Sequence, residues 1–419
     1  MKAKRNVLVI GGGVIGVACA YYLNRDGHQV TVIDKGEIGA ECSKGNCGLV
    51  CPSHVLPLAE PGAIGSAAAS MLKPGGPFHI RPRIDPAMWK WMASFAKRCN
   101  RDDMIESAKA IQPLLTSSLD LYRELVATEG IECEFHKQGL LFVYRNSKAL
   151  DAYEPTNRLL TERFNEPAQK IEGDELLEFE PALRSGLAGA WYFEHDAHLR
   201  PDRLMASWRS LLEQRGVRFV ENRALEDFNV SSGHVASATA SGEAFDADLF
   251  VVATGARTPL LAPILGQRVP IEPGKGYSIT VPRPATCPTY PMIFPERRVA
   301  VTPMETGLRL GSIMEFTGYD ESIRPERLRL LTSATQEYLR DVQFDESWPE
   351  KWYGWRPMTY DSTPVIGRCP GLSNVYLATG HNMLGLSMAP ATGRLIAEML
   401  SDSDTHISPT PYRVERFSA

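Results

Sequence analysis

A glycine-rich loop near the N-terminus is the first part of the sequence with a recognisable chemistry. The loop, Gly11-Gly12-Gly13-Val14-Ile15-Gly16, follows a short apolar run at residues 6–10 and precedes a segment with helical periodicity. Gly11 would permit a tight turn, Gly13 would let the backbone approach a pyrophosphate, and Gly16 would let the helix pack on the strand. A helix N-terminus here would also favour phosphates. The loop therefore predicts a dinucleotide site.

An acidic residue stands where a ribose would bind. Asp34 ends a second apolar run, residues 30–34, about 20 residues after the loop, as in dinucleotide-binding β-α-β units. Its carboxylate could accept hydrogen bonds from both ribose hydroxyls, whereas the alternative is a solvated acid in a turn. Residues 6–34 are thus predicted to form a complete β-α-β unit.

The segment that follows separates two kinds of dinucleotide. An enzyme that uses NAD would continue with regular β-α repeats, and residues 35–55 do not. They contain Ser43, Asn46 and Gly48 in a Ser-x-x-Asn-x-Gly pattern, which resembles the D-amino-acid oxidase superfamily of flavoproteins. In that superfamily this segment wraps the flavin end of FAD, so the resemblance implies FAD as the cofactor.

Three further segments carry the same resemblance. Residues 354–367 fit the pattern G-x-R-P-x-T-x-D-x-x-P-x-x-G, which is similar to bacterial D-amino-acid dehydrogenases of the small-subunit type and to glycine oxidases. Residues 374–393 resemble the second FAD-contacting stretch of that family. Residues 275–278, Lys-Gly-Tyr-Ser, match a segment of its substrate domain. The resemblance covers the whole chain.

The resemblance also implies which residues hold FAD. No cysteine stands near residues 356–358, where the sarcosine-oxidase branch attaches flavin covalently, so FAD is expected to be non-covalent. The implied FAD contacts are Gly11, Gly13, Val14, Ile15, Gly16, Asp34, Lys35, Ser43, Asn46, Gly48, Leu49, Leu225, Gly255, Gly380, Met383, Leu384, Gly385, Leu386 and Ser387.

The expected reaction is oxidation of a small D-amino acid, by hydride transfer from Cα to flavin N5. By resemblance, Arg356 would bind the substrate carboxylate, because a guanidinium matches a carboxylate bidentately. The alternative for Arg356 is a structural salt bridge. Tyr277 would add a hydroxyl hydrogen bond to the carboxylate or would pack in the core. His381 and His54 are the candidates for acid–base chemistry, although a lone histidine is more often structural, and His381 could instead orient the flavin.

The product and substrate range follow from this chemistry. The amine would react in its neutral form, and the imine product would hydrolyse to a 2-oxo acid and ammonia. A D-proline or D-hydroxyproline type of substrate would leave a cyclic imine instead. Glycine oxidases place a second arginine in the C-terminal loop, where this chain has Met383 or Leu384. An apolar residue there suits a bulkier substrate.

Two other functions stay open at this stage. One is an O₂-using oxidase of glycine or sarcosine, and the other is a non-catalytic flavin subunit of a larger complex. The electron acceptor is accordingly a membrane quinone or O₂. A predicted helix at residues 86–100 indicates either peripheral contact with the inner face of a membrane or packing of its apolar stripe in the core. The residues concerned are Met88, Trp89, Lys90, Trp91, Met92, Phe95, Lys97 and Arg98.

Two domains are needed to position these residues. We predict an α/β chain with a discontinuous, Rossmann-like FAD domain of the glutathione-reductase type, formed by residues 1–75, 196–260 and 351–419. Residues 76–195 and 261–350 would form an α+β substrate domain with a mixed or antiparallel sheet. Further expected segments are helices over 104–129, 147–165, 201–215, 325–340 and 389–400, a meander over 224–246 and an irregular stretch over 56–80.

The composition bounds the class of protein. The 419 residues are 43% hydrophobic with a net charge of −5, which is typical of a globular protein and unlike a basic nucleic-acid-binding protein. No apolar run reaches the ~18 residues of a membrane span. The scattered cysteines form no CxxC pair or metal pattern, which predicts reduced thiols in the cytoplasm and no metal. Cys42, Cys47 and Cys51 would either touch the cofactor or fill small apolar spaces. The oligomeric state stays open.

Overall fold

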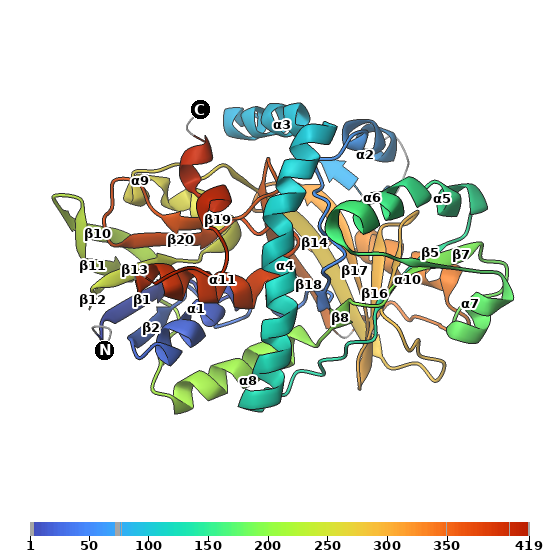
Figure 1. The fold of residues 1–419 in the computed structure, drawn as a ribbon, viewed down its shortest axis with the longest axis horizontal. Helices are drawn as coiled ribbons and strands as arrows, with labels where there is room; N and C mark the ends of the chain where they lie inside the picture. Colours follow the sequence, from blue (N-terminus) through green and yellow to red (C-terminus); the bar gives the residue numbers. More distant parts are fainter. Residues whose placement is uncertain (1–3, 72–75, 77, 349, 402, 418–419) are drawn as a thin grey trace.

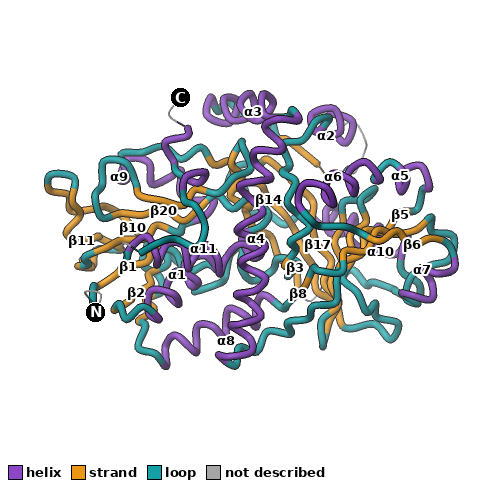
Figure 2. The backbone as a smooth tube through the Cα atoms, viewed as in Figure 1, coloured by secondary structure: helices purple, strands orange, loops and turns teal. Residues whose placement is uncertain are grey.

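The computed structural model contains two large sheets, one at each end of the molecule, with the long helix α4 (Arg101–Glu129) crossing between them (Figure 1). The structure describes residues 4–71, 76, 78–348, 350–401 and 403–417. Figure 2 shows the strands gathered in two groups, with helices on their outer surfaces. Both sheets contribute to the site described below.

The first sheet has six strands in the order β19-β20-β13-β1-β2-β9. All neighbouring pairs are parallel except β19–β20, so most carboxyl ends meet at one edge, where α/β sheets bind ligands. The strands are β1 (Asn6–Ile10), β2 (Gln29–Ile33), β9 (Arg218–Val220), β13 (Leu249–Val252), β19 (Val365–Arg368) and β20 (Val375–Thr379).

The two faces of this sheet are covered differently. Helices α1 (Val14–Arg25) and α11 (Gly385–Leu400) pack on each other so closely that a Cβ on Gly393 would lie 2.5 Å from the carbonyl oxygen of Ala18. A three-stranded meander packs on the other face through contacts such as Phe228 with Phe250. Its strands, β10 (Leu225–Ser231), β11 (His234–Ala240) and β12 (Glu243–Asp246), confirm the predicted meander.

The second sheet has nine strands, eight of them in the order β18-β14-β17-β16-β15-β5-β7-β6, with β4 paired to β17. Most pairs are antiparallel, whereas β15–β5 and β17–β4 are parallel, so the predicted mixed sheet is confirmed. The strands are β4 (Phe78–Ile80), β5 (Leu140–Tyr144), β6 (Gln169–Glu172), β7 (Gly189–Phe193), β14 (Ile271–Pro282), β15 (Met292–Phe294), β16 (Val299–Pro303), β17 (Gly307–Phe316) and β18 (Glu350–Thr359).

The remaining elements connect the two sheets or cover them. Strands β3 (Leu49–Val50) and β8 (Ala197–His198) form a two-stranded ribbon. The remaining described helices are α2 (Ala63–Met71), α3 (Pro86–Arg98), α5 (Ser147–Asp151), α6 (Glu154–Phe164), α7 (Asp174–Phe179), α8 (Pro201–Gln214), α9 (Ala262–Leu265) and α10 (Pro325–Tyr338), with 3₁₀ turns at Gly255–Leu261, Thr410–Tyr412 and Val414–Phe417. Among the described helices, none is both long and apolar enough to cross a membrane.

The division into two domains stays a proposal, and one strand bears on its boundary. Strand β18 lies in the segment 351–419 that we assign to the FAD domain. It pairs along its full length with β14, from Glu350 opposite Thr280 to Thr359 opposite Ile271. This strand is therefore part of the nine-stranded sheet, and the chain enters the six-stranded sheet only at β19.

Three expected segments differ in the structure. The stretch 56–80 is not irregular throughout, because it contains α2, whose alanines favour a helix, and the short strand β4; residues 72–75 and 77 lie outside the described residues. The expected helix over 147–165 is two helices, and a proline in the first turn of α6 marks the new start. Helix α11 begins at Gly385 rather than at residue 389.

Helix α3 shows how its apolar stripe is used. Met88 and Trp91 are buried, and the Trp91 ring stacks on that of Phe95 at 5.3 Å. The Trp91 indole N–H donates to the carbonyl of Met358 at 3.0 Å, which ties α3 to β18. Core packing therefore accounts for most of the stripe, while Trp89 stays half exposed on the outer side.

Candidate active site

A cavity of about 660 Å³ lies where the carboxyl edge of the six-stranded sheet meets β14, β17 and β18. Of the residues predicted to hold FAD or substrate, all line this cavity except Gly16 and Gly380. Residues from the beginning, middle and end of the chain thus share one space. The lining comes from both sheets, as a site for a cofactor and a substrate requires.

Gly16 and Gly380 support the wall from behind. A Cβ on Gly16 would overlap the carbonyl oxygen of Gly11, so only glycine lets α1 begin directly behind the loop. Gly380 has a φ of +72°, in the left-handed region that turns the chain after β20. These two glycines shape the wall of the site, although neither is among the residues that line the cavity.

The first turn of α1 meets the cavity at Gly13, Val14 and Ile15. The N-cap residue is Gly13, which has no side chain to cap the helix. Ser43, from the predicted FAD segment, reaches across instead, and its Oγ accepts a hydrogen bond from the Val14 N–H at 2.8 Å. The positive end of the helix dipole is therefore available to a phosphate group.

Asp34 is fixed at the end of β2. Its Oδ2 accepts a hydrogen bond from the Gly12 N–H at 2.7 Å, and its Oδ1 accepts one from the Gly36 N–H at 2.9 Å. Burial raises the pKa of this carboxyl, while the two backbone donors oppose that rise. Each oxygen keeps a lone pair that a ribose hydroxyl could use. The neighbouring Lys35 lines the cavity and pairs with Glu41 at 2.5 Å.

The segment after β2 folds back on itself to line the cavity. Asn46 accepts a hydrogen bond from the Gly48 N–H at 2.9 Å and donates to the carbonyls of Cys42 and Ser43. The amide side chain thus holds the loop shape, which gives a physical reason for the spacing of Asn46 and Gly48 in this chain. Leu49, the first residue of β3, completes this wall.

The C-terminal loop brings a second helix N-terminus to the cavity. Gly385, Leu386 and Ser387 form the first turn of α11 and line the cavity, and no side chain caps this turn. The Ser387 hydroxyl donates to the carbonyl of Leu49 at 2.9 Å, which locks the loop to the ribbon strand β3. A helix N-terminus in this place can stabilise negative charge on a flavin.

His381 is buried in this loop and stays neutral. Burial lowers the pKa of its imidazole to about 3, and its Nε2 lies 3.0 Å from the Thr392 hydroxyl. An imidazole that stays neutral at neutral pH does not store an additional proton. The geometry therefore favours the interpretation in which His381 orients the loop and its contents.

Arg356 is a half-buried cation that lacks a carboxylate partner among the described residues. Its Nη1 donates to the carbonyl of Ile313 at 2.9 Å, and its guanidinium lies against Gly276, where a Cβ would overlap it. Burial lowers its pKa, with only the thiols of Cys42 and Cys47 acting in the other direction. A structural salt bridge is thus absent here, and the cavity presents a cation that an anionic ligand would satisfy.

Tyr277 touches the cavity with its ring, but its hydroxyl is engaged elsewhere. The hydroxyl donates to Glu315 at 2.7 Å, and Glu315 is held by Arg324 and Arg327, each at 2.6 Å. Glu315 and Tyr277 are both almost fully buried. This network favours a structural role for the Tyr277 hydroxyl over a hydrogen bond to a substrate carboxylate.

Several residues that line the cavity were not predicted from the sequence. Trp352 and Trp355 precede Arg356 on β18, and their place in the same strand was the available signal. Arg257, after β13, lies 5.0 Å from the Trp355 ring and 3.2 Å from Glu41, a pairing that no local pattern indicates. The other unpredicted members include Leu260, Leu261, Ile264, Ile293, Ala300 and Ser312, whereas the lining residues Cys42, Cys47, Cys51 and His54 were already candidates in the sequence.

The cavity fits the FAD that the sequence implies. It offers a glycine cradle and a helix N-terminus for a pyrophosphate, an acid for a ribose, and a second helix N-terminus near Arg356. A Cβ on Gly13 would approach Ser43 Oγ to 3.2 Å, so the cradle is open only because the residue is glycine. A reactive ring held against Arg356 would meet a substrate bound by that guanidinium.

Comparison with known proteins gives consistent results. The family described as FAD dependent oxidoreductase matches residues 6–399. A D-amino acid dehydrogenase of Cereibacter sphaeroides is 32% identical over 99% of this chain and 95% of its own length. One of Rhodopseudomonas palustris is 34% identical over 99% of this chain and 98% of its own length.

Solved structures support the fold. A glycine oxidase from Geobacillus kaustophilus superposes with a TM-score of 0.77 at 22% identity, covering 99% of both chains. An L-proline dehydrogenase from P. horikoshii gives a TM-score of 0.74 at 21% identity, covering 100% of this chain and 99% of its own. At these identities the likeness concerns architecture and confirms the predicted flavoprotein fold.

Proposed function

Because the chain belongs to the family of FAD-dependent oxidoreductases, we propose that it oxidises a D-amino acid at Cα with non-covalently bound FAD. The curated relatives that match nearly the whole chain are named D-amino acid dehydrogenases, which supports this substrate class. The imine formed would hydrolyse to a 2-oxo acid. FAD, when bound, supplies the hydride acceptor.

The observation that carries this proposal is the half-buried guanidinium of Arg356, which faces the cavity and pairs with no carboxylate among the described residues. A cation partly withdrawn from water favours an anionic partner, and an α-carboxylate matches the guanidinium fork. The Ile313 carbonyl and Gly276 hold the side chain in place before any ligand arrives. Arg356 would therefore fix the substrate by its carboxylate and orient its Cα.

The rest of the cavity wall supports a substrate with an apolar side chain. Met383 and Leu384 line the cavity and occupy the loop position at which the resemblance places a second arginine in glycine oxidases. Ile293 and Ala300 add apolar surface from the nine-stranded sheet. We therefore favour substrates with some bulk, including the D-proline and D-hydroxyproline types, over glycine.

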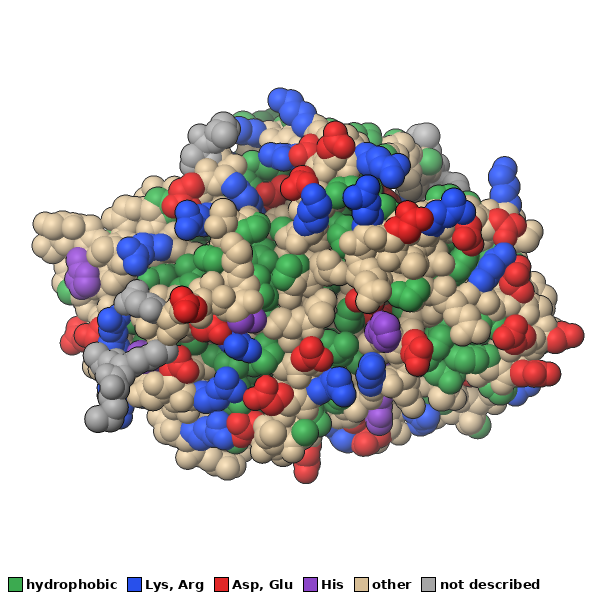
Figure 3. All heavy atoms as spheres, viewed as in Figure 1, with side chains coloured by type: hydrophobic (Ala, Val, Ile, Leu, Met, Phe, Trp, Pro, Cys, Tyr) green, Lys and Arg blue, Asp and Glu red, His purple; other side chains and the backbone are tan. Residues whose placement is uncertain are grey.

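For the electron acceptor we propose a membrane quinone, reached through peripheral contact at α2 and α3. Exposed apolar side chains gather here: Ile64 and Met71 on α2, Ile84 before α3, and Trp89 on α3. Figure 3 shows basic side chains, interspersed with acidic ones, near the upper edge of the molecule, where Figure 1 places α3. Apolar and basic groups together suit an anionic lipid surface.

The membrane contact can be tested by sedimentation with anionic vesicles of phosphatidylglycerol. We expect the holoenzyme to bind them and Trp89→Ala to bind less, with Val230→Ala as control, because Val230 is exposed on the distant meander. Binding that is absent, or equal in the two variants, would favour O₂ or a diffusible acceptor.

An anaerobic screen tests the proposed reaction. The holoenzyme is mixed with D- and L-amino acids, glycine, sarcosine and the hydroxyprolines, and loss of the visible flavin absorbance is followed. We expect reduction by D-amino acids and not by their L enantiomers. Reduction by glycine or sarcosine alone, with peroxide formed in air, would favour the oxidase alternative. No reduction by any compound would favour a non-catalytic flavin subunit.

A further inference from the structure

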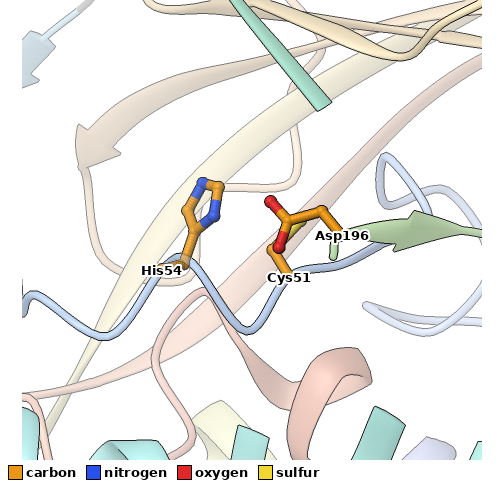
Figure 4. Close-up of side chains that lie close together, drawn as sticks. All are labelled: Cys51, His54 and Asp196. Carbon is orange, nitrogen blue, oxygen red and sulfur yellow. The ribbon is translucent and has the colours of Figure 1, made fainter. Parts of the chain in front are cut away.

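Three ionisable side chains converge at the wall of the cavity: Cys51, His54 and Asp196 (Figure 4). Their nearest nitrogen, oxygen and sulfur atoms all lie within 4.8 Å of one another. Cys51 and His54 line the cavity, whereas Asp196 lies behind them with 0% of its surface exposed. Neither the binding of a substrate carboxylate by Arg356 nor the cradle for a pyrophosphate requires any of the three.

The ribbon of β3 and β8 brings these residues together. Val50 pairs with Ala197 in antiparallel register, so Cys51 and Asp196, the next residue in each strand direction, lie opposite each other. The chain then turns, and the His54 N–H donates to the Cys51 carbonyl at 3.2 Å. Two segments far apart in sequence are thus joined beside the loop of Ser387, whose hydroxyl binds Leu49.

Ser53 links His54 to Asp196 by hydrogen bonds. The Ser53 hydroxyl donates to Asp196 Oδ2 at 2.5 Å and lies 3.2 Å from His54 Nδ1. The Ser53 backbone N–H donates to Asp196 Oδ1 at 3.1 Å. The path from the cavity to the buried carboxylate is therefore continuous, and it runs from imidazole through hydroxyl to carboxylate.

We propose that His54, Ser53 and Asp196 form a proton relay that accepts the proton of the substrate ammonium group. This inference rests on the proposed function, because an amino acid carries an ammonium group at neutral pH and must lose a proton before hydride leaves Cα. The N–H bond of the ammonium breaks and its proton goes to His54 Nε2. The Nδ1 proton passes to Ser53 Oγ, and the Ser53 hydroxyl proton passes to Asp196.

In total, one proton moves from the substrate to Asp196. The substrate becomes a neutral amine and Asp196 becomes a neutral acid, while His54 changes only its tautomer. Burial lowers the pKa of His54 to about 4, so the imidazole passes the proton on instead of holding it. Burial raises the pKa of Asp196 to about 7, against the hydrogen bonds from Ser53, so the carboxyl can hold a proton near neutral pH.

Two further ionisable groups act on Asp196. The charge of Glu166 helps to raise the Asp196 pKa, whereas a hydrogen bond from the Cys51 thiol lowers it. Glu166 itself lies 3.7 Å from His195, whose side chain is 49% exposed. The proton affinity of Asp196 is therefore set by its burial and by these neighbours together.

A metal ion is the competing use of the same three side chains. Cysteine, histidine and aspartate are all ligands of Zn²⁺. Here, however, both oxygens of Asp196 accept hydrogen bonds from Ser53, and His54 Nδ1 is within reach of the Ser53 hydroxyl. These hydrogen bonds already connect His54 to Asp196 through Ser53 without a metal ion, and they therefore favour the relay.

The test measures the limiting rate of anaerobic flavin reduction by D-alanine and by D-proline across pH. General acid–base catalysis contributes about 10²–10⁴-fold, so we expect His54→Asn and Asp196→Asn to lower the rate at neutral pH by about 100-fold. The loss should shrink as pH rises above the pKa of the substrate amine, which then arrives neutral. Ser53→Ala should act in the same way if Asp196→Asn does not fold.

The matched control is His136→Asn. His136 lies outside the cavity lining and contacts the His198 ring at 5.4 Å, so its replacement should leave the rate and its pH profile unchanged. Variants of the relay that keep the wild-type pH profile would overturn the proposal while the proposed function stands. A wild-type flavin that neither amino acid reduces would instead count against the proposed function and, with it, the relay.

Two measurements independent of turnover complete the test. Infrared titration of the substrate-free holoenzyme should show a carboxyl band that titrates near pH 7 and is missing in Asp196→Asn; its absence from the wild type would overturn the relay. Metal analysis after equilibration with Zn²⁺ should show no ion that depends on Asp196. One stoichiometric ion, lost in Asp196→Asn, would make the cluster a metal site and overturn the relay.

Discussion

At the scale of single residues, Arg356 and Tyr277 have opposite relations to the cavity. Arg356 pairs with no described carboxylate, and its Nη1 donates only to the Ile313 carbonyl and, at 4.0 Å, to the Met314 sulfur among the described residues. The Tyr277 hydroxyl is bonded to Glu315, whose charge is already shared by Arg324 and Arg327. The guanidinium of Arg356 can therefore bind an anionic ligand, whereas the hydrogen-bonding capacity of the Tyr277 hydroxyl is already used within the protein.

Replacement of Arg356 by alanine should therefore damage substrate binding and not FAD binding. A charge-assisted bidentate pair in a closed site supports a loss of at least about 100-fold in kcat/KM. Arg356→Lys should recover only part of it, because an ammonium lacks the fork. Steady-state kinetics and flavin content are the measurements. Arg329→Ala, at an exposed pair with Glu346, serves as control, and unchanged kinetics in Arg356→Ala would remove Arg356 from the site.

Tyr277→Phe should change stability more than catalysis. It removes a hydrogen bond to a buried carboxylate, so we expect a loss of about 1.5–3 kcal/mol in the free energy of unfolding. Urea unfolding and kcat/KM are measured on the same holoenzyme. A fall in kcat/KM as deep as that of Arg356→Ala would instead show that the hydroxyl binds substrate.

The residues of the site were predictable to different degrees. The glycine loop, Asp34 and the segment with Asn46 act through local geometry, and the structure places them at the cavity, with Gly16 behind its wall. Asp196 could not be linked to His54, because only the pairing of β3 with β8 brings them together. The engagement of Tyr277 with Glu315 depends likewise on the register of β14 and β17.

At the scale of elements, the pairing of β14 with β18 determines where Arg356 lies. Gly274 stands opposite Arg356 in this register, and Gly276, two residues on, lies under the guanidinium. The Lys-Gly-Tyr-Ser segment therefore has a steric reason for its glycine. A side chain at residue 276 would push the cation out of its place.

Gly276→Ala should accordingly behave like a mild form of Arg356→Ala. A Cβ at residue 276 would overlap the guanidinium, and we expect kcat/KM to fall by about 10-fold or more with FAD retained. Gly65→Ala in α2, where a Cβ would meet nothing within 4 Å, is the matched control. Equal kinetics in the two variants would show that the guanidinium can shift without cost.

Elements with strong local signals were predicted well. The strand 140–144 and the starts of α3 and α8, marked by prolines at residues 86 and 201, match the structure. The early start of α11 was missed because Gly385 disfavours a helix interior, although it suits a first turn that must approach a ligand. The strand β18 was assigned to the FAD domain from its place in the sequence, whereas its pairing partner is β14.

At the scale of the whole molecule, stability should depend on pH through three buried histidines. Burial lowers the pKa of His54 to about 4 and those of His198 and His381 to about 3. Each has a pKa near 6.5 when unfolded, so below that pH the unfolded chain binds more protons and stability falls on acidification. Asp196, whose pKa is raised to about 7, opposes this with one proton, and the three histidines outweigh it.

Urea unfolding of the holoenzyme at about pH 7 and about pH 5 checks this prediction. Each uncompensated proton contributes up to about 1.4 kcal/mol per pH unit, so the midpoint should be clearly lower at the acidic pH. The Asp196→Asn variant should lose stability more steeply on acidification, because the opposing proton is gone. An equal or higher midpoint at about pH 5 would mean that the histidines are protonated in the folded protein.

Strand β18 makes the position of Arg356 depend on the arrangement of the two sheets. It leaves the nine-stranded sheet at Thr359, and the chain joins the six-stranded sheet at Val365 after a corner where Asp361 pairs with Arg416 at 2.7 Å. Arg356 thus lies three residues before the end of a strand of the nine-stranded sheet, while the chain that follows belongs to the six-stranded sheet. A shift of one sheet relative to the other would therefore also move the guanidinium relative to the glycine loop, so the distance between substrate and cofactor depends on how the two sheets are held together.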